Sequence, residues 1–261
     1  MLKHIAAPHK ALSVVAIAAL LATAPQPLTA STAVNLANVT SGTYFRPPSN
    51  PRLGSGYRTS TGTRYGACLG GTETAFTLFG PDDSELIAGL TTSSHPTFAW
   101  HLPETEATVP VIFRLLAPDE DNIPVPVYQT KLDYDAGLMS HQLPDTVEAL
   151  TTDTEYRWQV IVECNPEFPA QAIIQERSFE VVPTSATLAQ ALSSATTASD
   201  RAVAYGQAGV WYDAIAQVAQ ARTATDSETR MGLLTDLAAS LPEEKEQLRQ
   251  DILDIIAVTE R

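Results

Sequence analysis

The sequence predicts a mainly β protein, an antiparallel β-sandwich followed by a small C-terminal helical module. Two observations lead to this prediction. Short apolar runs rich in β-branched and aromatic residues recur between about residues 74 and 183, separated by Pro, Gly and Asp clusters. After residue 184 the apolar residues change to helical spacing. Because no helix-length pattern separates the strand-like runs, we expect antiparallel pairing and a sandwich.

Seven runs define the expected strands. Alternation with a period of two residues is clearest in the sixth, where Tyr156 and Trp158 share one face while Arg157 and Gln159 share the other. One face of this strand is therefore expected to be buried. The runs are TAFTLFG, PTFAWHL, VIFRLLA, VYQTKL, LMSHQL, YRWQVIVE and IIQERSFEVV.

The sixth run also begins with a tyrosine-corner spacing. Leu150 precedes Tyr156 by six residues, a separation over which a corner tyrosine hydrogen-bonds back to the backbone. This spacing resembles the immunoglobulin and fibronectin type III sandwiches, which implies an immunoglobulin/fibronectin-like fold for this part of the chain. Antibody domains carry a cysteine two residues after the tyrosine, where this chain has Trp158. A bond between Cys68 and Cys164 would therefore pin the preceding arm to the end of this strand instead of joining the two sheets.

The N-terminus has the layout of a secretory signal peptide. Lys3 and Lys10 precede the uncharged run Ala11–Ala24, which is short for a membrane span, and no later segment could cross a bilayer. A retained N-terminal anchor is the alternative. We expect a periplasmic or secreted protein of the cell envelope. In that compartment Cys68 and Cys164, which are its only cysteines, should form a disulfide, with two buried free thiols as the alternative.

Composition divides the chain into four segments. We expect a signal peptide at 1–30, a Ser/Gly/Pro/Arg-rich arm at 31–73, the β-sandwich at 74–184 and the helical module at 185–261. The chain has 30 acidic and 16 basic residues and a net charge of −14, which disfavours nucleic acid as a partner. Residues 31–72 instead contain arginines and no acid. We expect this arm to lie on the chain's own acidic body; contact with an anionic wall polymer or lipid head group is the alternative.

The helical module contains one motif of interest. The stretch 202–221 matches the helix–turn–helix of a tetratricopeptide repeat, with Gly209 at the tight turn, but no second copy follows. Trp211 and Tyr212 begin the second helix of this hairpin, and we expect both in the core. The alternative is a partner-binding surface formed by Trp211, Tyr212 and Asp213.

Two capping boxes are expected further along this module. Thr225 with Glu228 fits one, and Ser240 with Glu243 fits the other. Pro242 suits the first turn of a final helix that continues through residues 248–256.

Residues with possible chemistry do not form a catalytic or metal-binding motif. His95, His101 and His141 lack a tight metal-ligand spacing, and we expect them at the surface or rim of the sheets instead of on zinc. The acidic loop Asp119–Asn122 could bind calcium, but it lacks the EF-hand pattern and fits a solvated turn better. We therefore assign no catalytic, metal-binding or cofactor-binding residues.

The overall layout resembles a known family. An exported start is followed in order by a PP…R-G arm, a cysteine after Arg-Gly-type turns, PTFAWHLP, YRWQVIVEC and AGVWYDAI. This order resembles the cyanobacterial secreted domain-of-unknown-function family numbered nine-two-eight. The resemblance covers nearly all of residues 45–241. The resemblance implies no activity and no catalytic residues.

The sequence favours a non-enzymatic binding or scaffolding module for an unidentified envelope protein or polysaccharide. The alternatives are an envelope carbohydrate-binding protein, using aromatic side chains such as Trp100, and a glycan hydrolase with a pair of carboxylates. No cofactor is expected, and the oligomeric state is left open.

Overall fold

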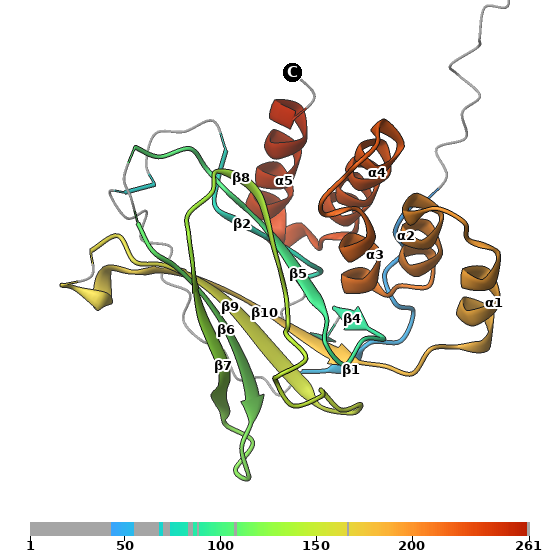
Figure 1. Cartoon of the computed structure of the whole chain (residues 1–261), viewed down its shortest axis with the longest axis horizontal. Helices are drawn as coiled ribbons and strands as arrows, with labels where there is room; N and C mark the ends of the chain where they lie inside the picture. Colours follow the sequence, from blue (N-terminus) through green and yellow to red (C-terminus); the bar gives the residue numbers. More distant parts are fainter. Residues whose placement is uncertain are drawn as a thin grey trace, which may run out of the picture. The chain divides into compact units, whose positions relative to one another are not determined.

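Two main β-sheets and five α-helices make up the described part of the structure, a computed structural model of the chain (Figure 1). The larger sheet has the strand order β4 (Leu90–Thr91), β10 (Ile173–Val181), β9 (Glu155–Val162), β6 (Val111–Pro118) and β7 (Pro124–Leu132). The smaller has the order β2 (Thr77–Phe79), β5 (Thr97–Leu102) and β8 (Gly137–Gln142). A two-stranded sheet pairs β1 (Arg52–Leu53) with β3 (Leu86–Ile87), and a 3-10 turn, η2 (Pro169–Gln171), precedes β10.

The structure describes residues 43–54, 68–69, 74–82, 86–87, 89–106, 109–165 and 167–259. These all belong to one compact unit, residues 42–261. The predicted signal peptide and most of the predicted arm lie outside the described residues. Each of the seven predicted strand runs contains an observed strand, and the two sheets agree with the predicted sandwich-like arrangement.

The core lies between the two facing sheets. Phe98 and Trp100 of β5 pack against Phe113 of β6 and Trp158 of β9, with ring centroids 5.0 to 6.3 Å apart. All four rings are fully buried. Because Trp100 has no exposed surface, the expectation that it could bind a sugar on the sandwich face is wrong.

Tyr156 begins the buried face of β9. Its hydroxyl accepts a hydrogen bond from the backbone N–H of Thr151 at 3.0 Å and lies 3.2 Å from the Thr151 hydroxyl. The hydrogen-bond partner of Tyr156 is thus the residue that follows Leu150. Leu150 itself is buried and donates its N–H to the carbonyl of Ser94. The tyrosine fixes the loop that enters β9, as a corner tyrosine does.

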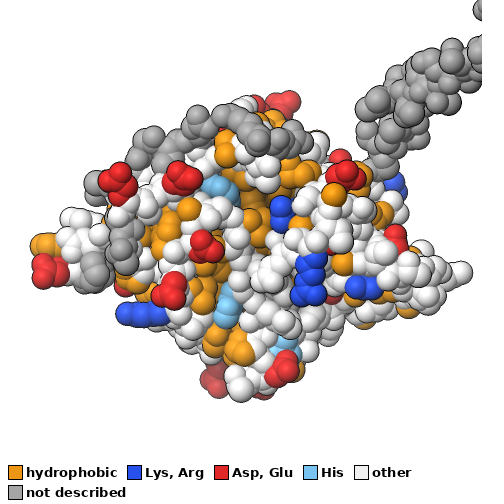
Figure 2. Space-filling model, turned by 45° about the horizontal axis from the view of Figure 1, so that its top comes forward, with side chains coloured by type: hydrophobic (Ala, Val, Ile, Leu, Met, Phe, Trp, Pro, Cys, Tyr) orange, Lys and Arg blue, Asp and Glu red, His pale blue; other side chains and the backbone are white. Residues whose placement is uncertain are grey.

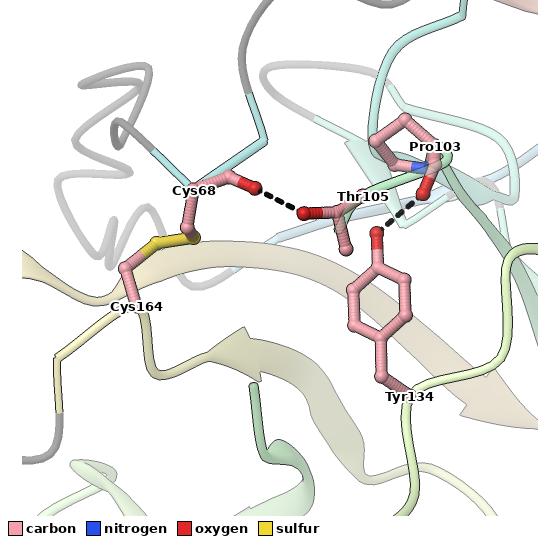
Figure 3. The surroundings of a disulfide bond; sticks show 5 residues. All are labelled: Cys68, Pro103, Thr105, Tyr134 and Cys164. Atoms are coloured by element: carbon pink, nitrogen blue, oxygen red, sulfur yellow. Dashed lines mark hydrogen bonds between the residues drawn. A yellow bond between two sulfur atoms is a disulfide. The ribbon is translucent and has the colours of Figure 1, made fainter. Parts of the chain in front are cut away.

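The predicted Cys68–Cys164 disulfide is confirmed, with the two Cα atoms 5.5 Å apart. Cys164 follows the end of β9, so the bond ties a loop to a strand end and does not cross the core. Figure 3 shows the neighbouring hydrogen bonds, from the hydroxyl of Thr105 to the carbonyl of Cys68 and from the hydroxyl of Tyr134 to the carbonyl of Pro103.

Five α-helices follow β10 in the described residues. They are α1 (Ala186–Ser194), α2 (Ala198–Gln207), α3 (Trp211–Val218), α4 (Ala224–Ser240) and α5 (Glu246–Thr259), the last preceded by a 3-10 turn, η3 (Glu243–Lys245). Helices α2 and α3 form the predicted hairpin. Gly209 lies between them with a φ of +78°, a conformation that favours glycine.

Both predicted capping boxes are wrong. Helix α4 is capped by Thr223 with Asp226, two residues before the predicted pair Thr225 and Glu228. Ser240 instead donates its hydroxyl to the carbonyl of Leu237, and Pro242 precedes η3 without a side-chain cap. A further box that the sequence analysis did not identify, Thr197 with Asp200, begins α2.

Residues 43–48 form a strap that lies between α2 and α4. The backbone N–H groups of Tyr44 and Phe45 donate to the Asp236 carboxylate, at 2.5 and 3.0 Å, and Arg46 N–H donates to the carbonyl of Gly206. Phe45 is buried against Trp211, with ring centroids 5.0 Å apart. This part of the predicted arm is therefore built into the helical module.

Further along the arm, Arg52 binds Glu180 of β10 at 3.0 Å and lies 3.6 Å from Asp153. These contacts agree with an arm that lies on the acidic body. Arg58 and Arg64 lie outside the described residues.

Candidate functional site

The first turn of α3 fastens the helices to the sandwich. Trp211 donates its indole N–H to the carbonyl of Phe79 in β2 at 3.0 Å. The ring of Tyr212 enters the aromatic core, where its hydroxyl accepts the Trp158 indole N–H at 2.8 Å. Both side chains are fully buried, so the expectation that they belong to the core is confirmed.

Two glycines make room for this tyrosine. A Cβ atom on Gly80 would lie 2.9 Å from the Tyr212 hydroxyl, and one on Gly89 would lie 2.8 Å from its ring. Neither distance is compatible with a real side chain. The tyrosine is thus held by backbone that approaches it closely, and burial raises its pKa above the ordinary tyrosine value.

Asp213 completes the contact. Its carboxylate accepts hydrogen bonds from the Thr91 hydroxyl at 2.6 Å and from the Thr92 N–H and hydroxyl at 2.9 and 2.8 Å. The proposed partner surface of Trp211, Tyr212 and Asp213 is therefore wrong. These residues do form a docking surface, but what docks on it is the chain's own sandwich.

The three histidines lie apart from one another. His95 contacts the carbonyl of Val147 at 2.9 Å, and His141 stacks on Tyr128. His101 is buried, contrary to the expected surface or rim position, and contacts the carbonyl of Ala75 at 3.1 Å. Burial lowers the pKa of His101 and of His141. Within the described ranges no group of three His, Cys, Asp or Glu side chains could hold a metal ion.

The acidic loop joins β6 to β7 as a turn. One oxygen of the Asp119 carboxylate accepts the N–H groups of Asp121 and Ile123, at 3.0 and 2.8 Å, while Asn122 has a φ of 62°. These are the hydrogen bonds of an aspartate that stabilises its own turn. The geometry agrees with a solvated turn.

A polar hollow of about 380 Å³ lies where the helices meet the outer face of the smaller sheet. We call it the arginine hollow. In β5 and β8 the residues that alternate away from the core, Thr97, Ser140 and Gln142, line one side, because Phe98 takes the inward position. The other side is lined by Arg201 of α2, Gln217 of α3, Gln220 and Arg222 of the turn between α3 and α4, and Asp226 of α4.

Hydrogen bonds orient the groups of this hollow. The Arg201 Nε donates to Gln217 Oε1 at 2.9 Å, which fixes its guanidinium against α3. Among the residues that the structure describes, neither Arg201 nor Arg222 forms an ion pair with a carboxylate. Two guanidinium groups therefore share one hollow with free donor capacity.

The one acid that lines the hollow is already engaged. Asp226 accepts hydrogen bonds from the Ser199 hydroxyl at 2.8 Å and from the N–H groups of Arg222 and Thr223 at 3.2 and 3.1 Å. Hydrogen bonds with Ser199 and Thr223 lower the pKa of this carboxyl group. Asp226 thus caps α4 and positions the backbone of Arg222.

Figure 2 shows how acidic and basic side chains are distributed on one face of the molecule. Basic side chains gather over the helices to the right of centre, whereas most acidic side chains on this face lie to the left. No local sequence pattern indicated Arg201 and Arg222, because Arg201 lies in α2 and Arg222 in the turn before α4, and only the fold brings them together.

A second hollow, of about 690 Å³, carries two acids, Glu106 and Asp133. Both residues are exposed to solvent. A carboxyl group that acts as general acid in glycoside hydrolysis is usually enclosed by apolar groups that raise its pKa. This pair therefore does not favour the hydrolase alternative.

A family model described as Domain of Unknown Function (DUF928) matches residues 59–240. The chain belongs to this family. Neither the comparison with curated proteins nor the comparison with solved structures gave a match. The family description assigns no chemistry.

Proposed function

We propose that the protein is an extracytoplasmic binding protein of the cyanobacterial cell envelope, and that its arginine hollow binds an acidic polysaccharide. The observation that carries the proposal is the convergence of Arg201 and Arg222, without a carboxylate partner among the described residues, in a chain with a net charge of −14. Because the net charge of the chain disfavours anions in general, two arginines without carboxylate partners in one hollow form a local site where an anionic chain can bind.

The chemistry of the lining suits an acidic sugar. A guanidinium binds a carboxylate or sulfate group through two parallel hydrogen bonds. Hydroxyl and amide groups such as those of Ser140, Gln142 and Gln220 can both donate to and accept from sugar hydroxyls. The volume of the hollow is within the range of small-ligand sites, which suits one or two sugar units of a longer chain.

The disulfide supports an extracytoplasmic location. The Cys68–Cys164 disulfide is stable in oxidising compartments and rare in the cytosol. In the part of the chain that the structure covers, no helix is both long and apolar enough to span a bilayer. Together with the predicted signal at 1–30, the disulfide supports export to the periplasm or beyond.

We also infer that the sandwich is of the immunoglobulin/fibronectin-like type. The order β2–β5–β8 against β10–β9–β6–β7 corresponds to strands A, B and E facing G, F, C and C′ of that fold. The short strand β4 pairs in parallel with β10 at the sheet edge. Tyr156 then lies near the start of strand F, the position of the corner tyrosine. The α2–α3 hairpin is proposed as a single tetratricopeptide-like unit that packs on this sandwich.

The test of function is a binding titration of the purified full chain with polygalacturonate, using neutral dextran as the control polymer. We expect binding to polygalacturonate that weakens with added salt, and none to dextran. The double variant Arg201→Gln, Arg222→Gln should weaken binding by tenfold or more. Arg114→Gln serves as the matched control, because this arginine binds Gln129 on the exposed face of the other sheet.

The result can contradict the proposal in two ways. Absence of binding to polygalacturonate at low salt would show that the hollow does not take an acidic polysaccharide. Equal weakening by the double variant and by Arg114→Gln, after correction for the number of charges removed, would show that binding follows net charge and not the hollow.

A further inference from the structure

A third, chemically different hollow of about 600 Å³ lies between the helices and the smaller sheet. It lies where α4 and α5 face the ends of β5 and β8, and we call it the apolar hollow. Its wall is formed mainly by aliphatic side chains: Leu102, Leu138, Met231, Leu234, Ile255 and Val258. In Figure 2 hydrophobic side chains gather in the upper part of the face, bordered by a basic and a histidine side chain.

The apolar hollow remains open to solvent although its wall is aliphatic. Leu234 and Ile255 are buried, with 2% and 4% of their surface exposed, and form the base. Val258 is 37% exposed, and Leu138 and Met231 are partly exposed. Small-molecule sites have this combination of an apolar wall and a few polar groups, and the volume is within their usual range.

One cation lines the apolar hollow. Arg230 of α4 is partly buried and donates one N–H to the carbonyl of Ala219 at 3.1 Å, which fixes the guanidinium at the end of α3. No carboxylate of the described residues forms an ion pair with it. Desolvation lowers its pKa, so this charge is only partly compensated where it lies.

The other polar groups of this hollow are weaker candidates for binding an anion. His101 contacts the Ala75 carbonyl through Nδ1, so that nitrogen carries the proton and Nε2 is left as an acceptor. Glu104 also lines the hollow but is exposed to solvent. The fixed positive charge that faces the aliphatic wall therefore comes from Arg230.

We propose that the apolar hollow binds a fatty acid, with the carboxylate on Arg230 and the acyl chain along Leu138, Leu234 and Val258. The aliphatic wall supplies most of the binding, because each methylene removed from water strengthens binding by up to about fourfold. Arg230 supplies selectivity for a charged head group, since its guanidinium can form two hydrogen bonds with a carboxylate. This inference does not depend on the polysaccharide proposal, because it concerns another hollow and another arginine.

The experiment is a calorimetric titration of the full chain with decanoate below its micelle concentration, and in parallel with 1-decanol. We expect decanoate to bind more tightly than decanol, and dodecanoate more tightly than decanoate. Arg230→Gln should weaken decanoate binding by about tenfold and leave decanol binding unchanged, whereas Val258→Arg should weaken the binding of both. Arg201→Gln, in the arginine hollow, is the matched control and should change neither.

Folding of each variant is checked by urea denaturation. If Arg230→Gln does not fold, Arg230→Lys is used instead; it keeps the charge and should retain the preference for decanoate over decanol. Val258 lies at an exposed helix end, so Val258→Arg still tests the contribution of the aliphatic wall. Failure of decanoate to bind the wild type, or an undiminished preference for decanoate in Arg230→Gln, would overturn the proposal. So would a dimer that Val258→Arg converts to a monomer, because the apolar hollow would then be covered by a second copy of the chain.

Discussion

Replacing Tyr212 with Phe tests whether the helices are fastened to the sandwich as the structure describes. The change keeps the ring contacts with Phe98, Phe179 and Trp158 but removes the hydroxyl that accepts the Trp158 indole N–H at 2.8 Å. Both partners are fully buried, so water cannot replace the lost acceptor. A buried donor left without a partner costs about 1–3 kcal/mol.

The same core already holds one such group. Among the described residues, the indole N–H of Trp100 is buried without a hydrogen-bond partner. Tyr212→Phe would leave the Trp158 indole N–H as a second such group in this core, so we expect a loss of about 2 kcal/mol. For a unit of this size that loss corresponds to a fall in Tm of roughly 4–8 °C.

The assay is urea denaturation followed by tryptophan fluorescence, with the midpoint shifted and the slope unchanged. Tyr128→Phe is the control, because its hydroxyl lies 3.2 Å from His141 in a partly exposed position. In a Trp158→Phe background the hydroxyl of Tyr212 is the group without a partner, so Tyr212→Phe should then be neutral or stabilising. Equal losses in both backgrounds would refute the role of this hydrogen bond.

Four further predictions concern other parts of the structure. Tyr156→Phe should lower the free energy of unfolding by about 1–3 kcal/mol, measured in urea, because the hydrogen bond to the loop before β9 is lost. Cys164→Ser should lower it by about 2–5 kcal/mol, and a mass spectrum of the unreduced wild type should show the cross-linked peptides. Gly206→Ala should displace the strap, since its Cβ would lie 2.1 Å from a backbone oxygen, and hydrogen exchange of residues 43–48 should rise; unchanged exchange would contradict this. Burial raises the pKa of Tyr134 to about 12 against about 10 in the unfolded chain, so stability should fall as pH rises between these values, and less in Tyr134→Phe.

The β part of the fold could be predicted because its signals are local. Each strand has its own alternation of apolar and polar residues and its own flanking turn residues. The strands that contain Trp100 and Trp158 could therefore be located from neighbouring residues in the sequence alone. The disulfide could be predicted from the even number of cysteines together with the predicted signal peptide. The helix caps were less certain, because a Thr–x–x–Asp pair two residues earlier competed with the Thr–x–x–Glu pair that begins at Thr225.

The candidate site could not be predicted, for a reason of distance along the chain. The arginine hollow combines β5, β8 and the segments around Arg201 and Arg222, which are up to about 125 residues apart, and no local pattern marks their meeting. The burial of Trp211 and Tyr212 was predicted, but their position between the helices and the sandwich was not. Their size indicates burial, but only the packed structure shows that they are buried between the helices and the sandwich.

The strap of residues 43–48 has a consequence for how the chain can mature. Tyr44 is held by Asp236, 192 residues later, so the first described segment to be synthesised finds its place only when α4 exists. Contacts this distant close late and slow the final step of folding. During synthesis the strap therefore remains without its partners until α4 has been made. A spectroscopic probe attached to this strap would therefore report when the whole chain has folded.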